Sequence, residues 1–425
     1  MHVLDELEAR GFIKQVSDAD GLRAHLAAGP VTLYLGIDPT AVSLHMGNFL
    51  QLMLLSHFVR AGHRVVLVTG GGTAMVGDPS GKSTVRTAPT LEDIERNLAG
   101  HRPLFRRFLP LAESLDDGVV LRNNADWLLK LGYVEFLRDI GRHFSVNEMV
   151  TAETYRRRLQ NQEHLPFIEF NYRLMQAYDF LHLHREYGVT LQVGGSDQWG
   201  NCVAGTELIR KAAGAKTFVL TTPLILTSSG KKMGKSEQGA VWITSKHTSA
   251  WDFFQYWMNV EDDDVARFMK LFTFMDLDEV AALTAVDGAA LKPAKARLAW
   301  EATAMCHSPD AADQQLAGAI RRFGLPADIV PTRAAAVSSA EDDSTPTVTV
   351  EASALEAGIP LFRLFQDAGL ANSGGEARRL AKQGGAYVNG AQIKDANTAI
   401  GADHLHDGSL LLRAGKKRYC RVVVG

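Results

Sequence analysis

The sequence predicts an α/β protein whose first half is a mainly parallel sheet, followed by a helical region and a small α+β module. Apolar runs rich in β-branched residues alternate with helical stretches, beginning with Val31–Leu35 and an amphipathic segment over residues 48–61. Alternation of this kind favours a parallel sheet. From residue 251 to about residue 322 the pattern becomes helical, with few strand signals. A chain of 425 residues has room for two or three domains.

The remaining strands of the first half run into loops rich in Gly, Asn or Asp. We expect these strands at Arg64–Val68, Val119–Arg122 and Thr190–Val193. Ligands of open α/β sheets bind at the carboxyl ends of the strands, so these loops are candidate site segments. In the helical region, the apolar spacing predicts helices over Asp263–Phe272 and Leu291–Met305.

A stretch with the composition of a linker separates the C-terminal module from the rest. Residues 325–350 contain Pro326, Pro331 and Pro346 together with an acidic run rich in Ser and Thr. The sequence therefore predicts four parts: an α/β domain over 1–245, a helical domain over 246–324, a linker over 325–350 and a C-terminal domain over 351–425.

Local signals in the C-terminal module predict one basic helix. Ser373, with Glu376 three residues later, forms a capping box that opens a helix through Gln383. Arg378 and Lys382 are four residues apart, so they share one face of this helix.

The rest of the C-terminal module is predicted to form strands, and the module as a whole is basic. Asn389-Gly390 is a strong hairpin signal, and residues 410–424 supply two further strands around Gly415. From residue 361 to the end there are ten basic and five acidic residues, a net charge of +5, which leaves −8 for residues 1–360. Such asymmetry suggests a module that meets a polyanion, and chance clustering on a solvated face is the alternative.

Composition and cysteine usage exclude several classes of protein. Hydrophobic residues make up 46% of the chain and charged residues 22%, as in an ordinary globular protein, which excludes general disorder. Cys202, Cys306 and Cys420 lie about a hundred residues apart, which excludes a disulfide framework and CxxC motifs and fits a reducing compartment. No signal peptide and no apolar run of about 20 residues is recognisable, so we expect a cytoplasmic protein without a membrane partner.

Two Gly-Lys-Ser segments invite comparison with a P-loop, but their spacing does not match. A P-loop has a further Gly five residues before the Gly of its Gly-Lys-Ser end. The corresponding positions before Gly81-Lys82-Ser83 and Gly234-Lys235-Ser236 are Val76 and Ser229. Lysines in Gly-rich loops can still neutralise phosphates without that turn. Both segments therefore remain candidates for phosphate contacts.

The first strand leads into a segment with the features of an anion site. After Tyr34-Leu-Gly-Ile-Asp38-Pro-Thr40, the segment His45-Met-Gly47-Asn48 opens a helix. Backbone N–H groups at such a helix start can face a phosphate, and Gly47 would allow close approach of the ligand. His45 could also donate to phosphate oxygens.

These segments carry a resemblance to a known family. His45-Met-Gly47-Asn48 and Lys232-Met-Gly-Lys235-Ser236, in that order, resemble the two signatures of the class I aminoacyl-tRNA synthetases. Three segments between them narrow the resemblance to the bacterial tyrosyl-tRNA synthetases: Gly77-Asp78-Pro-Ser-Gly-Lys82, Tyr172-Arg-Leu-Met-Gln176-Ala-Tyr-Asp179 and Gln192-Val-Gly-Gly195-Ser-Asp197-Gln198-Trp-Gly-Asn201. Asn48 and Gly234 depart from the general class pattern, but both variants are familiar among tyrosyl enzymes. The resemblance covers essentially the whole chain and implies a Rossmann-type catalytic domain, an anticodon-side helical domain and a C-terminal RNA-binding domain.

The resemblance implies a tyrosine–tRNA ligase that makes tyrosyl-adenylate from ATP and then charges tRNA(Tyr). The residues implied in catalysis hold phosphates or close on pyrophosphate, and they are His45, Thr40, Lys82, Arg86, Lys232 and Lys235. Tyr34 and Asp179 would bind the phenol hydroxyl, and an enzyme built this way rejects phenylalanine because buried polar groups are left unpaired. The residues implied on the amino-acid end of tyrosine are Asp78, Tyr172, Gln176 and Gln198.

The spacing of the tyrosine residues agrees with a shared pocket. Tyr172, Gln176 and Asp179 are four and three residues apart, so on a helix they share one face. The further residues implied in ATP binding are Gly36, Asp38, Gly47, Asn48, Gly195, Asp197 and Ser236, beside His45, Lys232 and Lys235.

The implied partners are L-tyrosine, ATP with Mg²⁺, tRNA(Tyr) and a second copy of the chain as a homodimer. Arg378, Arg379 and Lys382 are the implied RNA contacts. No tightly bound cofactor and no protein metal site is expected. His182 and His184 are two residues apart on a helix and so face away from each other, and His404 and His406 lack a third ligand nearby.

Three other functions compete with this prediction. A tryptophanyl enzyme of the same class is the nearest, and Tyr34 and Asp179 argue against it. An RNA-binding protein on a non-catalytic synthetase scaffold would be expected to lack intact signatures. A nucleotidyltransferase that adenylates another small acid would explain both signatures but not the basic C-terminal module.

Overall fold

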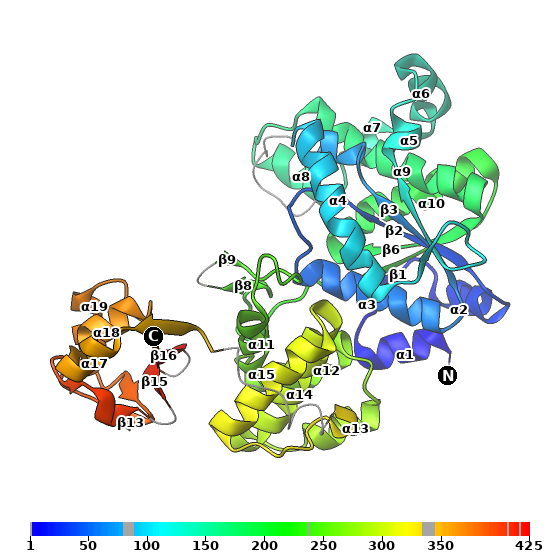
Figure 1. Ribbon diagram of the computed structural model, residues 1–425. Helices are drawn as coiled ribbons and strands as arrows, with labels where there is room; N and C mark the ends of the chain where they lie inside the picture. Colours follow the sequence, from blue (N-terminus) through cyan, green and yellow to red (C-terminus); the bar gives the residue numbers. More distant parts are fainter. Residues whose placement is uncertain (1, 80–88, 237–238, 334–344, 406–407, 416–417) are drawn as a thin grey trace. The chain divides into compact units, whose positions relative to one another are not determined.

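The computed structural model describes residues 2–79, 89–236, 239–333, 345–405, 408–415 and 418–425 (Figure 1). Lys82, Arg86, Lys416, Lys417 and residues 334–344 of the predicted linker lie outside the described residues. The chain divides into two compact units. Unit 1 comprises Met1–Ala312 and Asp328–Thr332, and unit 2 comprises Asp313–Ala327 and Arg333–Gly425. The four-part division by composition stays a prediction.

Unit 1 is built around a seven-stranded sheet that is parallel except at one edge. The strand order is β1-β7-β6-β2-β3-β5-β4, and only β1 runs antiparallel to its neighbour β7. The strands are β1 (Gln15–Val16), β2 (Thr32–Ile37), β3 (Arg64–Thr69), β4 (Leu111–Ala112), β5 (Val119–Asn123), β6 (Val189–Gly195) and β7 (Phe218–Thr222).

The four strands expected from the sequence are confirmed as β2, β3, β5 and β6. The structure adds β1, β4 and β7, which sequence reasoning missed. β7 is buried at every position. Polar Thr221 and Thr222 at its end shorten the apolar run by which a buried strand is recognised in a sequence. The edge strands β1 and β4 have two residues each, too few for a periodic signal.

Helices cover both faces of this sheet. Tyr34, Val66 and Val68 point to one face and form a core with Phe180 of α9 and Leu208 of α10. The alternate positions of the same strands are buried as well, and α3 packs on β3. The helices of this part are α1 (Val3–Arg10), α2 (Ala19–Ala27), α3 (Met46–Arg60), α4 (Leu91–Phe108), α5 (Ala125–Leu128), α6 (Tyr133–Asp139), α7 (Val146–Met149), α8 (Glu153–Gln160), α9 (Phe167–Tyr187) and α10 (Trp199–Ala213).

The helical region follows a small two-stranded ribbon, β8 (Lys235–Ser236) and β9 (Gly239–Ala240). Its helices are α11 (Ala250–Met258), α12 (Asp262–Phe272), α13 (Leu277–Leu283), α14 (Lys292–Cys306) and α15 (Pro309–Phe323). The two helices predicted here are confirmed as α12 and α14. The rings of Trp257 and Phe272 lie 5.1 Å apart, and Phe49 of α3 lies 5.0 Å from Phe272. These aromatic contacts fix α11 and α12 against the helix that begins with the first signature.

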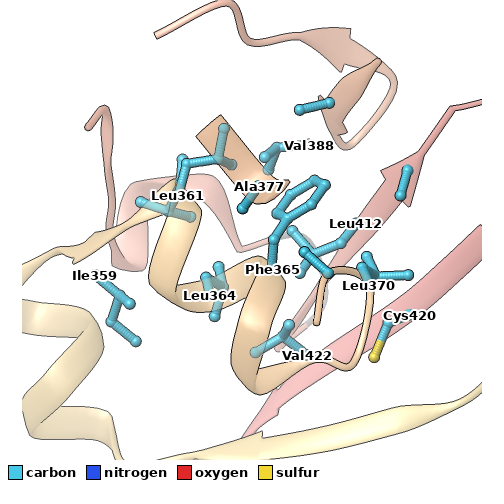
Figure 2. Close-up of a cluster of buried hydrophobic side chains, with 14 of the residues drawn as sticks. Ile359, Leu361, Leu364, Phe365, Leu370, Ala377, Val388, Leu412, Cys420 and Val422 are labelled. Atoms are coloured by element: carbon cyan, nitrogen blue, oxygen red, sulfur yellow. The ribbon is translucent and has the colours of Figure 1, made fainter. Parts of the chain in front are cut away.

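Unit 2 contains a five-stranded sheet in the order β10-β16-β15-β12-β13. Its elements from residue 345 on are β10 (Thr347–Val350), α17 (Ala352–Ala357), β11 (Ile359–Pro360), α18 (Leu361–Asp367), α19 (Gly374–Lys382), β12 (Ala386–Val388), β13 (Ala391–Gln392), β14 (Ala399–Ile400), β15 (Ser409–Ala414) and β16 (Arg418–Val424). Figure 2 shows its core, in which Leu364 and Phe365 of α18 pack against Leu412 and Val422 of the sheet.

The local predictions for unit 2 are confirmed, with one difference. Asn389 and Gly390 both have positive φ, 48° and 83°, as a tight hairpin between β12 and β13 requires. Ser373 caps α19 by accepting from Glu376 N at 3.2 Å. The carboxylate of Glu376 accepts from Asn372 N at 2.8 Å, one residue before the position that a capping box uses.

Within the described residues, no helix has the length and apolar character that crossing a membrane requires.

Candidate active site

A cavity of ≈ 340 Å³ opens at the carboxyl ends of β2 and β6, beside the start of α3 and along one face of α9. This is the position that the sheet topology predicts for a ligand. Twelve predicted site residues line it: Tyr34, Gly36, Asp38, Thr40, His45, Asn48, Asp78, Tyr172, Gln176, Asp179, Gly195 and Gln198. The helical spacing of Tyr172, Gln176 and Asp179 thus brings all three to one cavity.

Other predicted site residues lie elsewhere. Asp197 lines an adjoining cavity of ≈ 510 Å³. Gly47 and Lys232 are not among the lining residues of either cavity. Lys235 and Ser236 form β8.

The end of the cavity lined by buried side chains, which we call its closed end, holds a carboxylate whose position is fixed by two donors. Asp179 is 4% exposed and accepts from Asn124 Nδ2 at 2.9 Å and from Trp127 Nε1 at 2.7 Å. Burial raises the pKa of Asp179 to about 7, although the two hydrogen bonds oppose that shift.

Tyr34 lies at the same end and is 1% exposed. Its hydroxyl is buried and has no hydrogen-bond partner among the described residues. Burial raises its pKa well above the usual value, and the nearby Asp179 charge adds to this effect. A buried phenol without a partner has a free-energy cost that a polar ligand atom in the cavity would remove.

Two further carboxylates, both partly exposed, line the cavity. Asp38 accepts from Tyr172 Oη at 2.8 Å and from Thr73 Oγ1 at 2.7 Å. Asp78 accepts from Gln198 Nε2 at 2.6 Å. This part of the cavity is therefore negative and suits a cationic group.

An amide network connects Asp78 to the face of α9. Asn201 Nδ2 donates to Gln176 Oε1 at 3.1 Å and to Gln198 Oε1 at 3.2 Å. The orientation of each amide is thereby set by its neighbours, so that Gln198 turns its Nε2 toward Asp78.

His45 occupies the open end of the cavity and caps α3. Its Nδ1 accepts from Gly47 N at 3.1 Å and from Asn48 N at 3.3 Å, while Asn48 Oδ1 accepts from His45 N at 3.0 Å. The backbone N–H groups that we expected to face a phosphate are therefore bound to His45 in this structure. Because Nδ1 accepts, the ring proton is on Nε2, which makes His45 a donor through that atom.

The two signature segments lie against each other. Ile243 N donates to Leu44 O at 3.0 Å, and His45 forms an isolated antiparallel bridge with Trp242. A side-chain carbon added at Gly234 would lie 2.8 Å from Cγ of Met46, so Gly234 lets the second segment approach the start of α3 closely.

In unit 2, α19 presents the predicted RNA contacts. Arg378, Arg379 and Lys382 are all exposed on this helix. The guanidinium of Arg378 lies 3.8 Å from the ring centroid of Phe362, which orients it without covering its charge. No group of three or more His, Cys, Asp or Glu that could hold a metal ion occurs among the described residues.

Comparison with known proteins places this geometry in a family. Residues 26–324 match the family model for "tRNA synthetases class I (W and Y)", and residues 338–422 match "Tyrosine--tRNA ligase SYY-like C-terminal domain". The tyrosine–tRNA ligase of Desulfatibacillum aliphaticivorans is 49% identical over 100% of this chain and 99% of its own length. That of Rhodospirillum rubrum is 48% identical over 98% and 96%. The chain belongs to the tyrosine–tRNA ligase family.

Solved structures agree with membership in the tyrosine–tRNA ligase family. A C-terminally truncated mitochondrial tyrosyl-tRNA synthetase from Aspergillus nidulans is 28% identical, with a TM-score of 0.68 over 76% of this chain and 94% of that one. The Coccidioides posadasii counterpart is 29% identical, with a TM-score of 0.64 over 74% and 91%. The first family model covers tryptophanyl and tyrosyl enzymes together, and the second model with the named relatives decides for the tyrosyl branch.

Sequence reasoning missed several residues of this family member's cavity. Asn124 and Thr73 line the cavity and donate to Asp179 and Asp38, and Trp127, which does not line it, also donates to Asp179; none of the three belongs to a quoted segment. Asn124 follows β5, one of the strands expected to end in a site loop, so its position did carry a signal. Trp127 had none, because a lone Trp is ordinarily core.

A buried ion pair beside the cavity was missed as well. Arg158 Nη1 donates to Glu169 Oε2 at 2.7 Å, and both residues line the cavity. Their separation of eleven residues spans two helices, a spacing that no periodicity connects.

Proposed function

We propose that this member of the tyrosine–tRNA ligase family activates L-tyrosine with ATP, releasing pyrophosphate, and then transfers tyrosine to the 3′ end of tRNA(Tyr). Family membership makes the protein an enzyme, an aminoacyl-tRNA synthetase. The assignment of individual residues below is our proposal.

One observation carries the proposed substrate: the buried Tyr34 hydroxyl lies at the closed end of the cavity together with the fixed Asp179 carboxylate. A phenol hydroxyl can donate to Asp179 and accept from Tyr34, which would satisfy both groups. A phenylalanine ring in the same place would leave the buried Tyr34 hydroxyl unpaired and would give Asp179 no donor from the ligand, so it is rejected by the cost of buried polar groups without their partners. Tyrosyl-tRNA synthetases are the standard example of this kind of rejection.

The amino-acid end of tyrosine is proposed to bind at the negative part of the cavity. Asp78, Tyr172 and Gln176 would hold the α-ammonium, supported by the short Asp78–Gln198 contact and the amide network around it. Gln198 would then lie beside the tyrosine carboxylate. Binding the ammonium here leaves the carboxylate as the nucleophile that faces ATP.

The phosphate end supplies counter-charges. The tyrosine carboxylate attacks the α-phosphate, the bond between the α- and β-phosphates breaks, and pyrophosphate leaves with its electron pair, so no side-chain nucleophile is needed. His45 through Nε2 and Thr40 through its hydroxyl would donate to phosphate oxygens, and Lys82, Arg86, Lys232 and Lys235 would neutralise the leaving pyrophosphate. Mg²⁺ would enter with ATP as part of the substrate.

The nucleoside part of ATP is proposed to bind at the carboxyl ends of β2 and β6. The residues proposed to contact ATP there, besides those on the phosphates, are Gly36, Asp38, Gly47, Asn48, Gly195, Asp197 and Ser236. Asp197 would bind the ribose, since a carboxylate accepts from vicinal hydroxyl groups.

Exchange of label between pyrophosphate and ATP, measured with each of the twenty amino acids in turn, tests the activity directly. We expect exchange with tyrosine at a far lower apparent KM than with phenylalanine or tryptophan. Better exchange with tryptophan than with tyrosine would contradict the proposal. No exchange with any amino acid would favour a non-catalytic RNA-binding role.

Unit 2 is proposed to bind tRNA through α19, where Arg378, Arg379 and Lys382 are exposed. The test is a chain ending at residue 345, because β10 pairs with β16 and belongs to the sheet of unit 2. We expect this shortened protein to keep pyrophosphate exchange and lose both tRNA charging and salt-dependent tRNA binding. Changing the three basic residues to Glu in the full chain should reproduce much of that loss, whereas full charging by the shortened chain would contradict the RNA role.

A homodimer is proposed as well. Of the exposed large hydrophobic side chains among the described residues, eight lie between residues 129 and 168, including Tyr133, Val134 and Phe167. Such a concentration of apolar side chains is typical of an interface, and sedimentation of a Val134→Glu variant tests it. We propose a cytoplasmic location, because the family acts in translation and the three free cysteines suit a reducing compartment.

A further inference from the structure

The segment that carries Lys232 is held in place by the helical region of unit 1. We call residues 225–236 the lysine loop. Its outer part is a turn in which Thr227 N donates to Lys231 O at 2.8 Å and Gly230 N donates to Thr227 O at 2.8 Å. Lys232 is exposed and does not line the cavity. A role for Lys232 on phosphates therefore requires this segment to move toward the cavity.

Two carboxylates at the start of α12 hold the outer turn of the lysine loop. Asp264, which is buried, accepts from Ser228 N at 2.8 Å. Glu261, which is exposed, accepts from Ser229 Oγ at 2.8 Å and from Ser228 Oγ. These contacts join residues that are more than thirty positions apart in the sequence.

The inner end of the lysine loop is held separately. Gly234 N donates to Tyr256 Oη of α11 at 3.0 Å, and Gly234 packs on Met46 beside His45. Tyr256 and Asp264 bind backbone groups and define the shape of the loop. Glu261 differs from both, because it is exposed and because both of its carboxylate oxygens bind side-chain hydroxyls of the loop, in addition to the backbone of Ser229.

Glu261 lies at the start of α12, where a polar side chain usually caps the helix. Glu261 is the N-cap residue of α12, yet its side chain makes no capping hydrogen bond to that helix. A Ser, Thr, Asp or Asn at this position would usually bind the free N–H groups of the first turn. The carboxylate instead uses both oxygens on Ser228 and Ser229, and these hydroxyls with the nearby Lys231 charge lower its pKa.

We propose that Glu261 is a positioning residue that holds the lysine loop in a resting position, with Lys232 outside the cavity, until ATP draws the loop inward. The proposal rests on the phosphate role of Lys232 given above. Moving Lys232 onto a phosphate then requires the bonds from Ser228 and Ser229 to Glu261 to break. The free energy of those bonds is subtracted from the affinity for ATP.

The test uses two full-length variants that remove the same bonds from opposite sides, Glu261→Ala and the double variant Ser228→Ala/Ser229→Ala. Asp263→Ala is the matched control, because Asp263 is an exposed carboxylate in the first turn of α12 that makes none of these contacts. Single-turnover formation of tyrosyl-adenylate gives the apparent Kd for ATP, and equilibrium dialysis gives the Kd for tyrosine.

We expect both loop variants to lower the apparent Kd for ATP by about threefold to tenfold, because the bonds to Glu261 are exposed and water competes for both partners. The Kd for tyrosine should not change, and Asp263→Ala should match the unmodified protein. Combining the two changes should give no more than Glu261→Ala alone, since that change already removes every bond of the Glu261 carboxylate to the loop. Trypsin should also cleave faster after Lys231 and Lys232 in both variants, which reports loop release without reference to activity.

An unchanged or raised Kd for ATP in the loop variants would overturn the proposal, and a raised value would mean that Glu261 supports the ATP-bound arrangement. Equal trypsin cleavage in all proteins would overturn it as well. Failure of the proposed function is a separate result, because it would remove tyrosine-dependent adenylate formation from the unmodified protein itself.

Discussion

The two ends of the cavity differ in how completely the protein prepares them for a ligand. At the closed end, Tyr34 and Asp179 are buried, and Asn124 and Trp127 already hold the carboxylate in place. At the open end, His45 and Thr40 are exposed, and Lys232 belongs to a loop that lies outside the cavity. Discrimination between amino acids needs rigid, desolvated partners, whereas stabilising a departing pyrophosphate needs charges that can arrive and leave.

The sharpest way to test this contrast is to remove the donor at the open end while keeping the helix cap. His45→Asn retains a good N-cap for α3 through its amide oxygen, but its shorter side chain cannot place an N–H group where Nε2 of the imidazole would meet a phosphate. We expect adenylate formation to slow by about 10²- to 10³-fold, as for loss of one donor to a developing oxyanion. The Kd for tyrosine should stay within about twofold.

Single-turnover kinetics and equilibrium tyrosine binding separate these two effects. His45→Ala serves as the comparison, because it removes both the cap and the donor. Equal losses in tyrosine affinity and in rate would mean that His45 supports the whole cavity, and the contrast between its ends would disappear.

Removing the charge at the closed end should have the opposite effect, in which tyrosine binding weakens more than adenylate formation slows. Asp179→Asn takes away a charged acceptor, so tyrosine affinity should fall by about tenfold to a hundredfold, the range for a hydrogen bond to an ionised group. Isothermal titration with tyrosine measures this loss. An unchanged affinity would place the phenol hydroxyl elsewhere.

The same substitution should stabilise the fold at alkaline pH. The pKa of Asp179 rises from 3.8 to about 7 on folding, so the folded state binds the proton more tightly than the unfolded state. Its contribution is therefore most favourable below pH 4 and is lost as the pH rises through 7. At pH 8 the Tm of Asp179→Asn should exceed that of the unmodified protein, and at pH 4 the difference should shrink.

The unmodified protein should bind tyrosine more weakly in mild acid, if the ionised carboxylate is the acceptor. With a pKa of about 7 for Asp179, affinity should fall by about tenfold between pH 8 and pH 6. The dependence should be absent in Asp179→Asn. A pH-independent affinity in the unmodified protein would show that the carboxylate does not accept from the ligand.

Features of the fold and of the site that depend on residues close together in the chain could be predicted from the sequence. The parallel sheet follows from periodicity and α19 from its capping signal, and the spacing of Tyr172, Gln176 and Asp179 correctly gives one shared face in one cavity. These are local features, fixed by residues within a few positions of one another.

The groups that hold those side chains were not predictable in the same way. Asn124 reaches Asp179 across 55 positions, and Tyr172 reaches Asp38 across 134. Such contacts exist only after the sheet brings distant strand ends together. The hydrogen bond from Ser228 to Glu261 likewise joins a loop to the start of a helix. A Ser in that loop does not predict a Glu at that helix start as its partner, nor the reverse.

The smallest expected effect concerns a single hydroxyl. Tyr34→Phe preserves ring volume and the packing of the ring on Phe180, whose centroid lies 5.2 Å away. It removes one neutral hydrogen bond to the ligand phenol, about 1 kcal/mol or fivefold, from the affinity for tyrosine but not for phenylalanine. It also removes a buried hydroxyl that has no partner among the described residues, so the fold itself should gain stability. Pyrophosphate exchange with tyrosine and with phenylalanine measures the ratio, and Tyr178→Phe, a change on α9 next to Asp179 but outside the cavity lining, is the control. A ratio that stays constant in Tyr34→Phe would remove Tyr34 from the specificity site and leave Asp179 as the acceptor that distinguishes the two amino acids.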